Sequence, residues 1–187
     1  MDYTNFEIGQ PFPLPIKAQG DGGLFQIDAN GIMFILQLSN ADIIAVEAFR
    51  TGKMELALFE EDGLLFFLYQ IDGIFKEGWG DAPFSLSGLK TELLPDLKKL
   101  TDKTIHLYLV DSRLNTLLAL RRVSLSDDFF DMLTRHTASQ LAEPLTTEQH
   151  LAKVQKIWAK LTSAQMRKKA TAVIEVPLDI VMPKKEH

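Results

Sequence analysis

KMELALFEEDGLLFFLYQI, residues 53–71, is the stretch that decides the fold, because its pattern predicts two strands folded back on each other. From Met54 to Phe59, apolar residues recur with the period of two that is typical of a strand with one buried face. The pair Asp62-Gly63 follows, and both residue types tolerate the positive φ that tight hairpin turns require. The run from Leu64 to Ile71 is apolar on both faces, which indicates a central strand that is covered on both sides.

A second hairpin and a helix are predicted upstream of this stretch. The runs Leu24–Asp28 and Ile32–Leu38 flank Asn30-Gly31, and Asn-Gly is the strongest short hairpin signal. Before them, Phe12–Ile16 is compatible with an edge strand and Gly20–Gly23 with a flexible turn. Between Ser39 and Gly52 the apolar spacing becomes helical, with Asn40 or Asp42 as alternative caps at the start and Gly52 suited to the end.

Downstream of the central hairpin the pattern is first irregular and then regular again. Residues 72–97 are rich in glycine and aromatic residues and predict a long irregular loop, a kind of segment that is commonly functional or else mobile. The segments Thr104–Val110 and Thr116–Ser124 predict a further hairpin. Ser126 is suited to cap a helix that ends before Pro144, and Thr146 with Gln149 forms the capping-box pattern of another helix. In the tail, the sequence AVIEVPLDIVMP predicts a strand that can add to a sheet edge, in this molecule or another.

These elements predict an α+β protein. We expect a mostly antiparallel sheet of about six strands, with one early inserted helix and two or three C-terminal helices. Residues 1–125 form the predicted sheet domain, and residues 126–187 form a helical region with an extended tail that packs on the same domain. Because the strands precede the helices, a doubly wound parallel sheet is disfavoured, although the helix in 39–52 allows one crossover.

Composition excludes several classes of protein. The 187 residues are 46% apolar and 24% charged, as in average soluble globular proteins, and no segment approaches the length of a membrane span. The absence of cysteine excludes disulfides and thiolate metal sites and fits a reducing compartment, and no export signal is visible, so we expect a cytoplasmic protein. The net charge is −5, yet residues 146–187 contain 4 acidic and 8 basic residues. This C-terminal part is suited to binding an acidic surface of another molecule.

The segment Gly78–Phe84 is the first candidate interaction site. Its glycines allow the backbone to turn sharply and present the indole of Trp79, with Phe84 nearby, while Asp81 can fix the loop by accepting hydrogen bonds. Tryptophan is enriched at binding hot spots. The alternative is that Trp79 folds inward and fills one end of the core.

The second candidate site is a stripe of lysines, Lys153, Lys156 and Lys160, extended by Arg167, Lys168 and Lys169. Such a stripe can bind an acidic partner, but the more common role of helix-surface charge is solvation. A nucleic-acid-binding protein could also use a basic helix such as that in 153–169, although the acidic chain shows no recognised nucleic-acid motif.

Catalytic chemistry has weaker support. None of the four histidines has the HExxH spacing of a zinc site, and no catalytic, cofactor-binding or metal-binding set is predicted. His106 is the only histidine in a predicted strand; it could act as a general base oriented by Asp111 or Asp81, but packing beside Tyr108 is the simpler role.

We therefore expect a non-catalytic protein-interaction module, such as an accessory protein, adaptor or inhibitor of bacterial or phage type. The expected partner is a protein, with homo-oligomers left open and no membrane, nucleic acid or cofactor. One alternative is a small hydrolase-like enzyme with its site between the Trp79 loop and His106. The other alternative is a nucleic-acid-associated protein that uses the basic helix.

Overall fold

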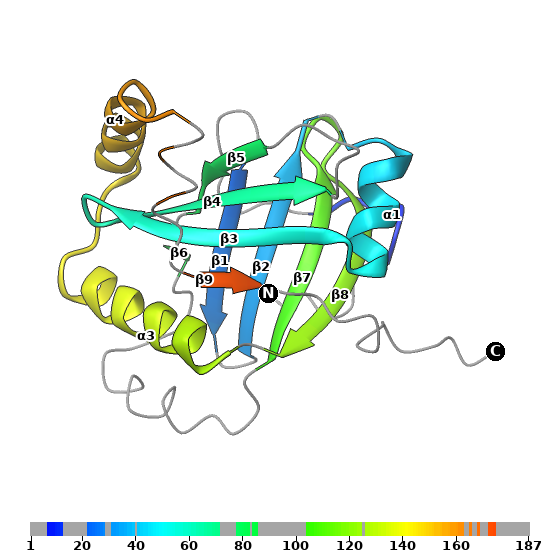
Figure 1. The fold of residues 1–187 in the computed structure, drawn as a ribbon, viewed down its shortest axis with the longest axis horizontal. Helices are drawn as coiled ribbons and strands as arrows, with labels where there is room; N and C mark the ends of the chain where they lie inside the picture. Colours follow the sequence, from blue (N-terminus) through cyan, green and yellow to red (C-terminus); the bar gives the residue numbers. More distant parts are fainter. Residues whose placement is uncertain are drawn as a thin grey trace.

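The computed structural model describes residues 7–12, 22–28, 31–39, 41–71, 78–82, 84–85, 104–124, 126–162, 165, 168 and 172–174. Within these residues the chain forms nine strands and three helices (Figure 1). The strands are β1 (Gly22–Asp28), β2 (Gly31–Leu38), β3 (Met54–Glu61), β4 (Leu64–Ile71), β5 (Gly78–Asp81), β6 (Phe84–Ser85), β7 (Thr104–Asp111), β8 (Thr116–Ser124) and β9 (Ala172–Ile174). The helices are α1 (Ile43–Thr51), α3 (Asp127–Ala142) and α4 (Thr147–Trp158).

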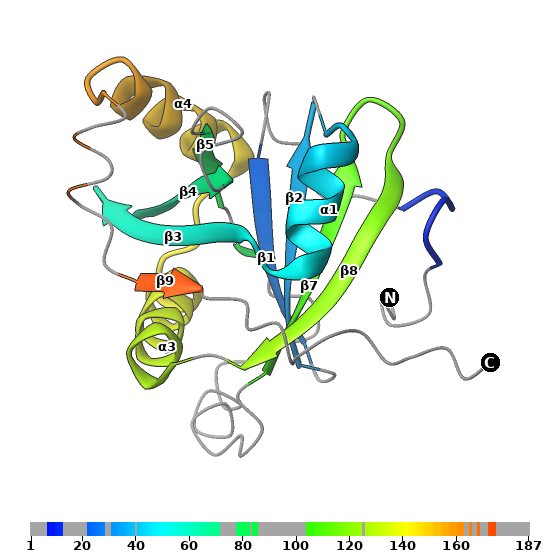
Figure 2. The same ribbon diagram turned by 45° about the vertical axis from the view of Figure 1, so that its right-hand side comes forward.

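The described strands form two sheets. Sheet A has the order β6-β1-β2-β7-β8, and sheet B has the order β5-β4-β3-β9. In Figure 1 the strands of sheet B run across those of sheet A, and Figure 2 shows α1 beside β8 and α3 below β3 and β9. This arrangement is an orthogonal packing of two sheets, in which the inner faces interdigitate to form the core.

The main core lies between the sheets. Strand β2 contributes Phe34 from sheet A and strand β4 contributes Phe67 from sheet B, and their rings meet edge-on with centroids 5.6 Å apart. Helix α1 adds Phe49 and helix α3 adds Phe129 to the same cluster of buried residues. The C-terminal region therefore contributes directly to the core of the sheets.

The structure confirms the central hairpin that the pattern of residues 53–71 predicts. Strands β3 and β4 pair antiparallel through a turn in which Asp62 has φ 52° and Gly63 has φ 77°. Strand β4 lies between β5 and β3, and the residues Leu64–Leu68 are buried in succession. Because Phe66 and Phe67 belong to different apolar clusters, both faces of β4 are covered.

The local helix signals are also confirmed. Asp42, not Asn40, caps α1 by accepting hydrogen bonds from the backbone of Ile44 and Ala45, and Gly52 ends the helix with φ 80°. Ser126 caps α3, and Thr146 with Gln149 forms the reciprocal capping box of α4. Each of these caps satisfies backbone groups that the helix itself leaves unpaired.

The α+β class, with one early helix and two C-terminal helices, is confirmed, but several details differ from the sequence-based expectation. The strands are more numerous and lie in two sheets, and β2 pairs with β7 in parallel. Gly22 and Gly23 belong to β1 instead of a turn, and the expected loop at 78–85 contains the short strands β5 and β6. Of the expected edge strand Phe12–Ile16, residues 13–16 lie outside the described part, whereas Pro11 bridges to Thr116.

The tail strand predicted for residues 172–183 is confirmed at Ala172–Ile174, which add to an edge within this molecule, whereas residues 175–183 lie outside the described part. Residues Leu56–Leu58 of β3 pair antiparallel with Ala172–Ile174. Within the described residues, the 3 residues of β9 pair with the middle of the 8-residue strand β3.

Gly23 is required by the close approach of two core rings. A Cβ built at this position would lie 2.5 Å from the Phe34 ring and 3.0 Å from the Phe67 ring. We therefore expect Gly23→Ala to lower the free energy of unfolding by about 1–3 kcal/mol, the usual cost of overpacking a core. Urea denaturation measures this loss. In the double variant Gly23→Ala/Phe34→Leu the two losses should be less than additive; full additivity would contradict the contact.

Candidate functional site

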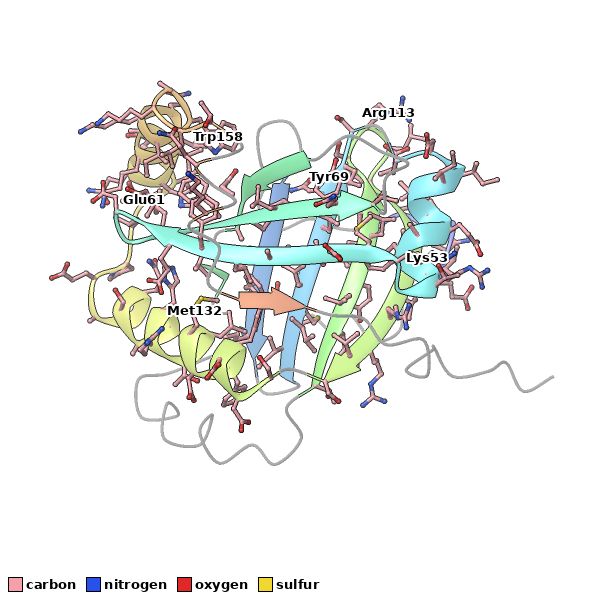
Figure 3. All side chains as sticks on the ribbon, in the orientation of Figure 1. Lys53, Glu61, Tyr69, Arg113, Met132 and Trp158 are labelled. Atoms are coloured by element: carbon pink, nitrogen blue, oxygen red, sulfur yellow. The ribbon has the colours of Figure 1, made fainter. Side chains whose placement is uncertain are left out.

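Helix α4 lies on the outer face of sheet B, at the end formed by the β3–β4 hairpin. Val154 and Ile157 are the buried residues of this helix. They pack with the outward-facing side chains of the sheet, which are Phe59, Leu64, Phe66 and Leu68. Figure 3 places Trp158 on α4 and Glu61 at the nearby turn. This apolar contact fixes which face of α4 is turned toward the sheet and which is turned away.

A polar contact beside this apolar cluster joins α4 to strand β5. The backbone of Asp81 is paired with Phe66, and the Asp81 carboxylate lies 2.9 Å from Nε2 of His150 in the first turn of α4. The side chains of Asp81 and His150 are 4% and 15% exposed, so water competes little for either group. Because an ionised carboxylate only accepts hydrogen bonds, Nε2 carries the proton and donates it. The imidazole thus supplies a hydrogen bond to the buried carboxylate, because burying an unpaired carboxylate costs free energy.

The contact between Asp81 and His150 brings the two candidate segments together. Asp81 belongs to the segment 78–84, and His150 lies on the helix that carries the lysines. The backbone of Trp79 is paired with Leu68 in sheet B. The backbone of Phe84 is paired with Phe25 in sheet A. The side chains of Trp79 and Phe84 lie outside the described part, so both directions considered for the indole stay predictions.

The candidate lysines differ in their surroundings. Nζ of Lys153 donates a hydrogen bond of 3.4 Å to the carbonyl of Asp62, so this half-buried lysine ties α4 to the β3–β4 turn. Lys156 and Lys160 are exposed. Lys156 lies on the side of the helix that Val154 and Ile157 leave uncovered, and Lys160 lies in the turn that follows the helix. Lys156 and Lys160 are therefore available to a partner in solution.

The basic segment is shorter as a helix than the range 153–169. Helix α4 ends at Trp158, and Lys160 follows in a turn. Thr162 and Gln165 then exchange backbone-to-side-chain hydrogen bonds in the reciprocal pattern that starts helices. Lys168 is exposed, whereas Arg167 and Lys169 lie outside the described residues.

A second histidine–carboxylate pair joins α3 to strand β3. Nδ1 of His136 lies 3.6 Å from the Glu60 carboxylate, and the two side chains are 4% and 42% exposed. Burial lowers the pKa of His136 below its ordinary value, and a charge on His150 acts in the same direction, whereas Glu60 opposes the lowering. The neutral imidazole is therefore the form that the fold favours.

The residues of the hydrolase alternative are not brought together. His106 alternates along β7 with the inward-facing Ile105 and Leu107, so it points to the outer face of sheet A. Asp81 is in sheet B and contacts His150. Asp111 contacts Arg113 at 3.4 Å; burial raises the pKa of Asp111, but hydrogen bonds and attraction from Arg113 outweigh burial and lower it. Neither carboxylate orients His106.

The sequence-based reasoning missed His136 and His150, although one signal could have found them. His150 precedes Val154 by four positions and Ile157 by seven, which is the spacing of one helical face. His136 likewise follows Phe129 by seven positions. A histidine on an apolar stripe becomes buried and needs a partner, but the stripe alone does not identify the carboxylate.

Three further findings bear on the site. Across the described ranges, no group of three or more histidine, aspartate or glutamate side chains is placed to hold a metal ion. No helix in that part of the chain has the length and apolar character to cross a membrane. Comparisons of the chain with models of known protein families, with curated proteins and with solved structures find no match.

Proposed function

We propose that this protein is a non-catalytic protein-interaction module that binds an acidic protein surface through the exposed face of α4 and the adjoining strand β5. The observation that carries the proposal is the 2.9 Å contact between Asp81 and His150. Because of this contact, the segment around Trp79 and the lysine-bearing helix form one continuous region instead of two distant ones. We name this region the α4–β5 surface: Lys156 and Lys160 are its exposed residues, Lys153 is half-buried, and the buried Asp81 joins α4 to the strand that carries Trp79.

The way in which α4 is attached supports binding rather than mere solvation. Val154 and Ile157 pack on sheet B, His150 contacts Asp81, and Lys153 contacts the carbonyl of Asp62. These contacts hold the helix in one place, so Lys156 is presented from a fixed backbone, and Lys160 lies in the turn that directly follows it. A surface that is ordered before binding loses less conformational entropy when a partner binds.

Charge supports an acidic partner. The whole chain has a net charge of −5, whereas residues 146–187 carry 8 basic and 4 acidic residues. A basic region on an acidic molecule attracts an acidic surface and repels a second basic one, which favours one orientation of the complex. Homo-oligomers through the same face are disfavoured, because two copies would bring lysines against lysines.

The polar contacts support a role without catalysis. His150 is paired with Asp81, His136 with Glu60, and Asp111 with Arg113. Each pair joins two elements of the fold or closes a turn. A general base needs a partner that orients it and a reacting group within reach; the carboxylates orient His150 and His136, but both imidazoles are largely buried, at 15% and 4% exposed.

Reversing the exposed charges is expected to weaken partner binding. The experiment captures partners from a lysate of the source cells on the immobilised full chain and then measures the affinity of the identified partner. Lys156→Glu and Lys160→Glu should each raise Kd by about tenfold at low salt, because each replaces an attraction by a repulsion. The matched control is Lys53→Glu, an exposed lysine that Figure 3 shows at the opposite end of the molecule.

The controls separate this proposal from its alternatives. Lys53→Glu should leave Kd unchanged, and unchanged binding in both α4 variants would overturn the proposal. Binding of nucleic acid would replace this proposal by the nucleic-acid alternative. Neutralising phosphates releases counterions, so binding of a labelled single-stranded oligonucleotide that falls steeply with salt and is lost in Lys156→Glu would identify a nucleic-acid protein.

A further inference from the structure

Within the described residues, the large apolar side chains that are exposed all lie at one end of sheet A. Ile8, Ile43, Ile44 and Leu114 are 59%, 83%, 41% and 71% exposed. Single exposed apolar side chains are common in proteins, whereas a contiguous group of them marks an interaction site. We name these four residues the end patch.

The turn between β7 and β8 lies against the start of α1. The backbone N–H of Ser112 in this turn donates to the carbonyl of Leu38 at 3.1 Å, and α1 starts shortly after Leu38, at Ile43. Figure 3 shows Arg113, the neighbour of Leu114, next to this end of α1, and Figure 2 shows the turn close to the helix as well. Leu114 therefore lies beside the isoleucines of α1.

The N-terminal segment brings Ile8 to the same end. The backbone N–H of Gly9 donates to the carbonyl of Leu117 at 2.7 Å, and the N–H of Leu117 donates to the carbonyl of Gln10 at 3.1 Å. These hydrogen bonds hold the segment 7–12 against the start of β8, where Figure 2 shows it in blue. The patch is thus assembled from three separate parts of the chain.

The isoleucines of the patch are not explained by the needs of α1. The buried residues of this helix are Ala45, Ala48 and Phe49. Isoleucine is β-branched and loses side-chain freedom in a helix, so polar straight-chain residues are better suited to an exposed first turn. Because Ile43 and Ile44 serve neither the core nor the helix well, they are better explained by a surface that becomes covered.

The charges around the patch have both signs. Glu7, Asp42 and Arg113 are exposed, and each directly precedes a patch residue in the chain. The Arg113 side chain is 65% exposed even though it contacts Asp111. In a twofold dimer the same surface faces itself, so a rim of one sign would repel its copy. A rim with both signs allows the acidic residues of one copy to face the arginine of the other.

We propose that the end patch is a self-association surface, through which two copies of this chain form a twofold symmetric dimer. The α4–β5 surface stays free in such a dimer, because Figure 1 shows α1 and α4 at opposite ends of the molecule. The dimer goes beyond the proposed function: it displays two α4–β5 surfaces, and an assembly with two binding surfaces gains affinity for a partner that offers two sites.

Sedimentation velocity of the full chain, without any partner, tests the dimer. We expect the mass to rise from that of the monomer towards twice that value as the concentration increases from about 1 to about 300 μM. A small interface of this kind gives weak association, so Kd should lie at about 10–100 μM. Hydrogen exchange at the two ends of this range should show added protection in the first turn of α1 and in the β7–β8 turn, but not in α4.

Two patch variants and one control make the result specific. Ile43→Glu and Leu114→Asp should each raise the dimer Kd by at least about tenfold, because each removes apolar burial, and twofold symmetry places each change in the interface twice. An acidic residue in the first turn of a helix is favourable, so Ile43→Glu should keep the urea midpoint of the wild type. Lys156→Glu, on α4, is the matched control and should leave the dimer unchanged.

The contrary outcomes are equally clear. A monomer at every concentration, an unchanged dimer in both patch variants, or association that continues beyond the dimer would overturn the proposal. A dimer that is lost in Lys156→Glu and kept in the patch variants would overturn it as well, since the copies would then meet through α4. Because self-association is measured without a partner, its failure is distinguishable from failure of the α4–β5 surface to bind.

Discussion

Phe34→Ala should lower the free energy of unfolding by about 3–5 kcal/mol, the range found when a buried phenylalanine is truncated in a core. Phe34 is 1% exposed and lies on β2, the middle strand of sheet A. Its ring centroid is 4.6 Å from that of Phe25 and 5.6 Å from that of Phe67. Truncation therefore removes contacts within sheet A and across to sheet B in one step.

Such a loss is large compared with the usual total. Small domains are stable by only about 5–15 kcal/mol, so the variant should have a much lower midpoint in urea and could unfold at physiological temperature. Equilibrium urea denaturation followed by circular dichroism measures the change. Phe34→Leu is the matched control, since it keeps four of the seven side-chain carbons and should therefore cost clearly less than Phe34→Ala. Equal losses in the two variants would contradict the role of the ring.

Arg121→Ala is expected to have an effect of similar size, about 3–5 kcal/mol, because it leaves buried carbonyl groups without their charged donor and opens a cavity. Arg121 is 1% exposed, and its Nη1 donates to the carbonyls of Phe49 at 3.4 Å and Arg50 at 2.8 Å. These carbonyls end α1, where the helix dipole is negative. The guanidinium thus fastens the C-terminus of α1 to strand β8.

Denaturation and hydrogen exchange together identify this role. Arg121→Ala should lower both the global stability and the protection of the last turn of α1. Arg122→Ala is the matched control, because Arg122 is the exposed neighbour on the same strand and surface charges contribute about 0–1 kcal/mol. If Arg121→Ala were no more destabilising than Arg122→Ala, the buried hydrogen bonds would not hold α1 in place.

Local signals in the sequence were sufficient for the individual elements. The capping box of Thr146 and Gln149 and the cap at Asp42 were predicted because they join residues at most three positions apart. The β3–β4 turn was predicted for the same reason, since Asp62 and Gly63 tolerate the positive φ that it requires. Interactions of this kind depend on a few adjacent residues and can be inferred without knowing the rest of the fold.

The candidate surface was predictable only in pieces. The lysine stripe and the segment of Trp79 and Asp81 were identified separately, and nothing in their spacing indicated that they meet. The contact that joins them connects residues 69 positions apart. His150 was visible as part of an apolar stripe, but many carboxylates in the chain could have been its partner.

By itself, the sequence determined the α+β class, the central hairpin, the positions of the helices and the basic character of the C-terminal part. Only the tertiary structure decided that the strands divide into two sheets, that β2 pairs in parallel with β7, and that Asp81 lies against α4. The physical reason is that backbone hydrogen bonds fit almost any pair of strands, so the choice of partners depends on how all apolar faces pack together. A period of two reveals which residues are buried, but not which sheet or helix buries them.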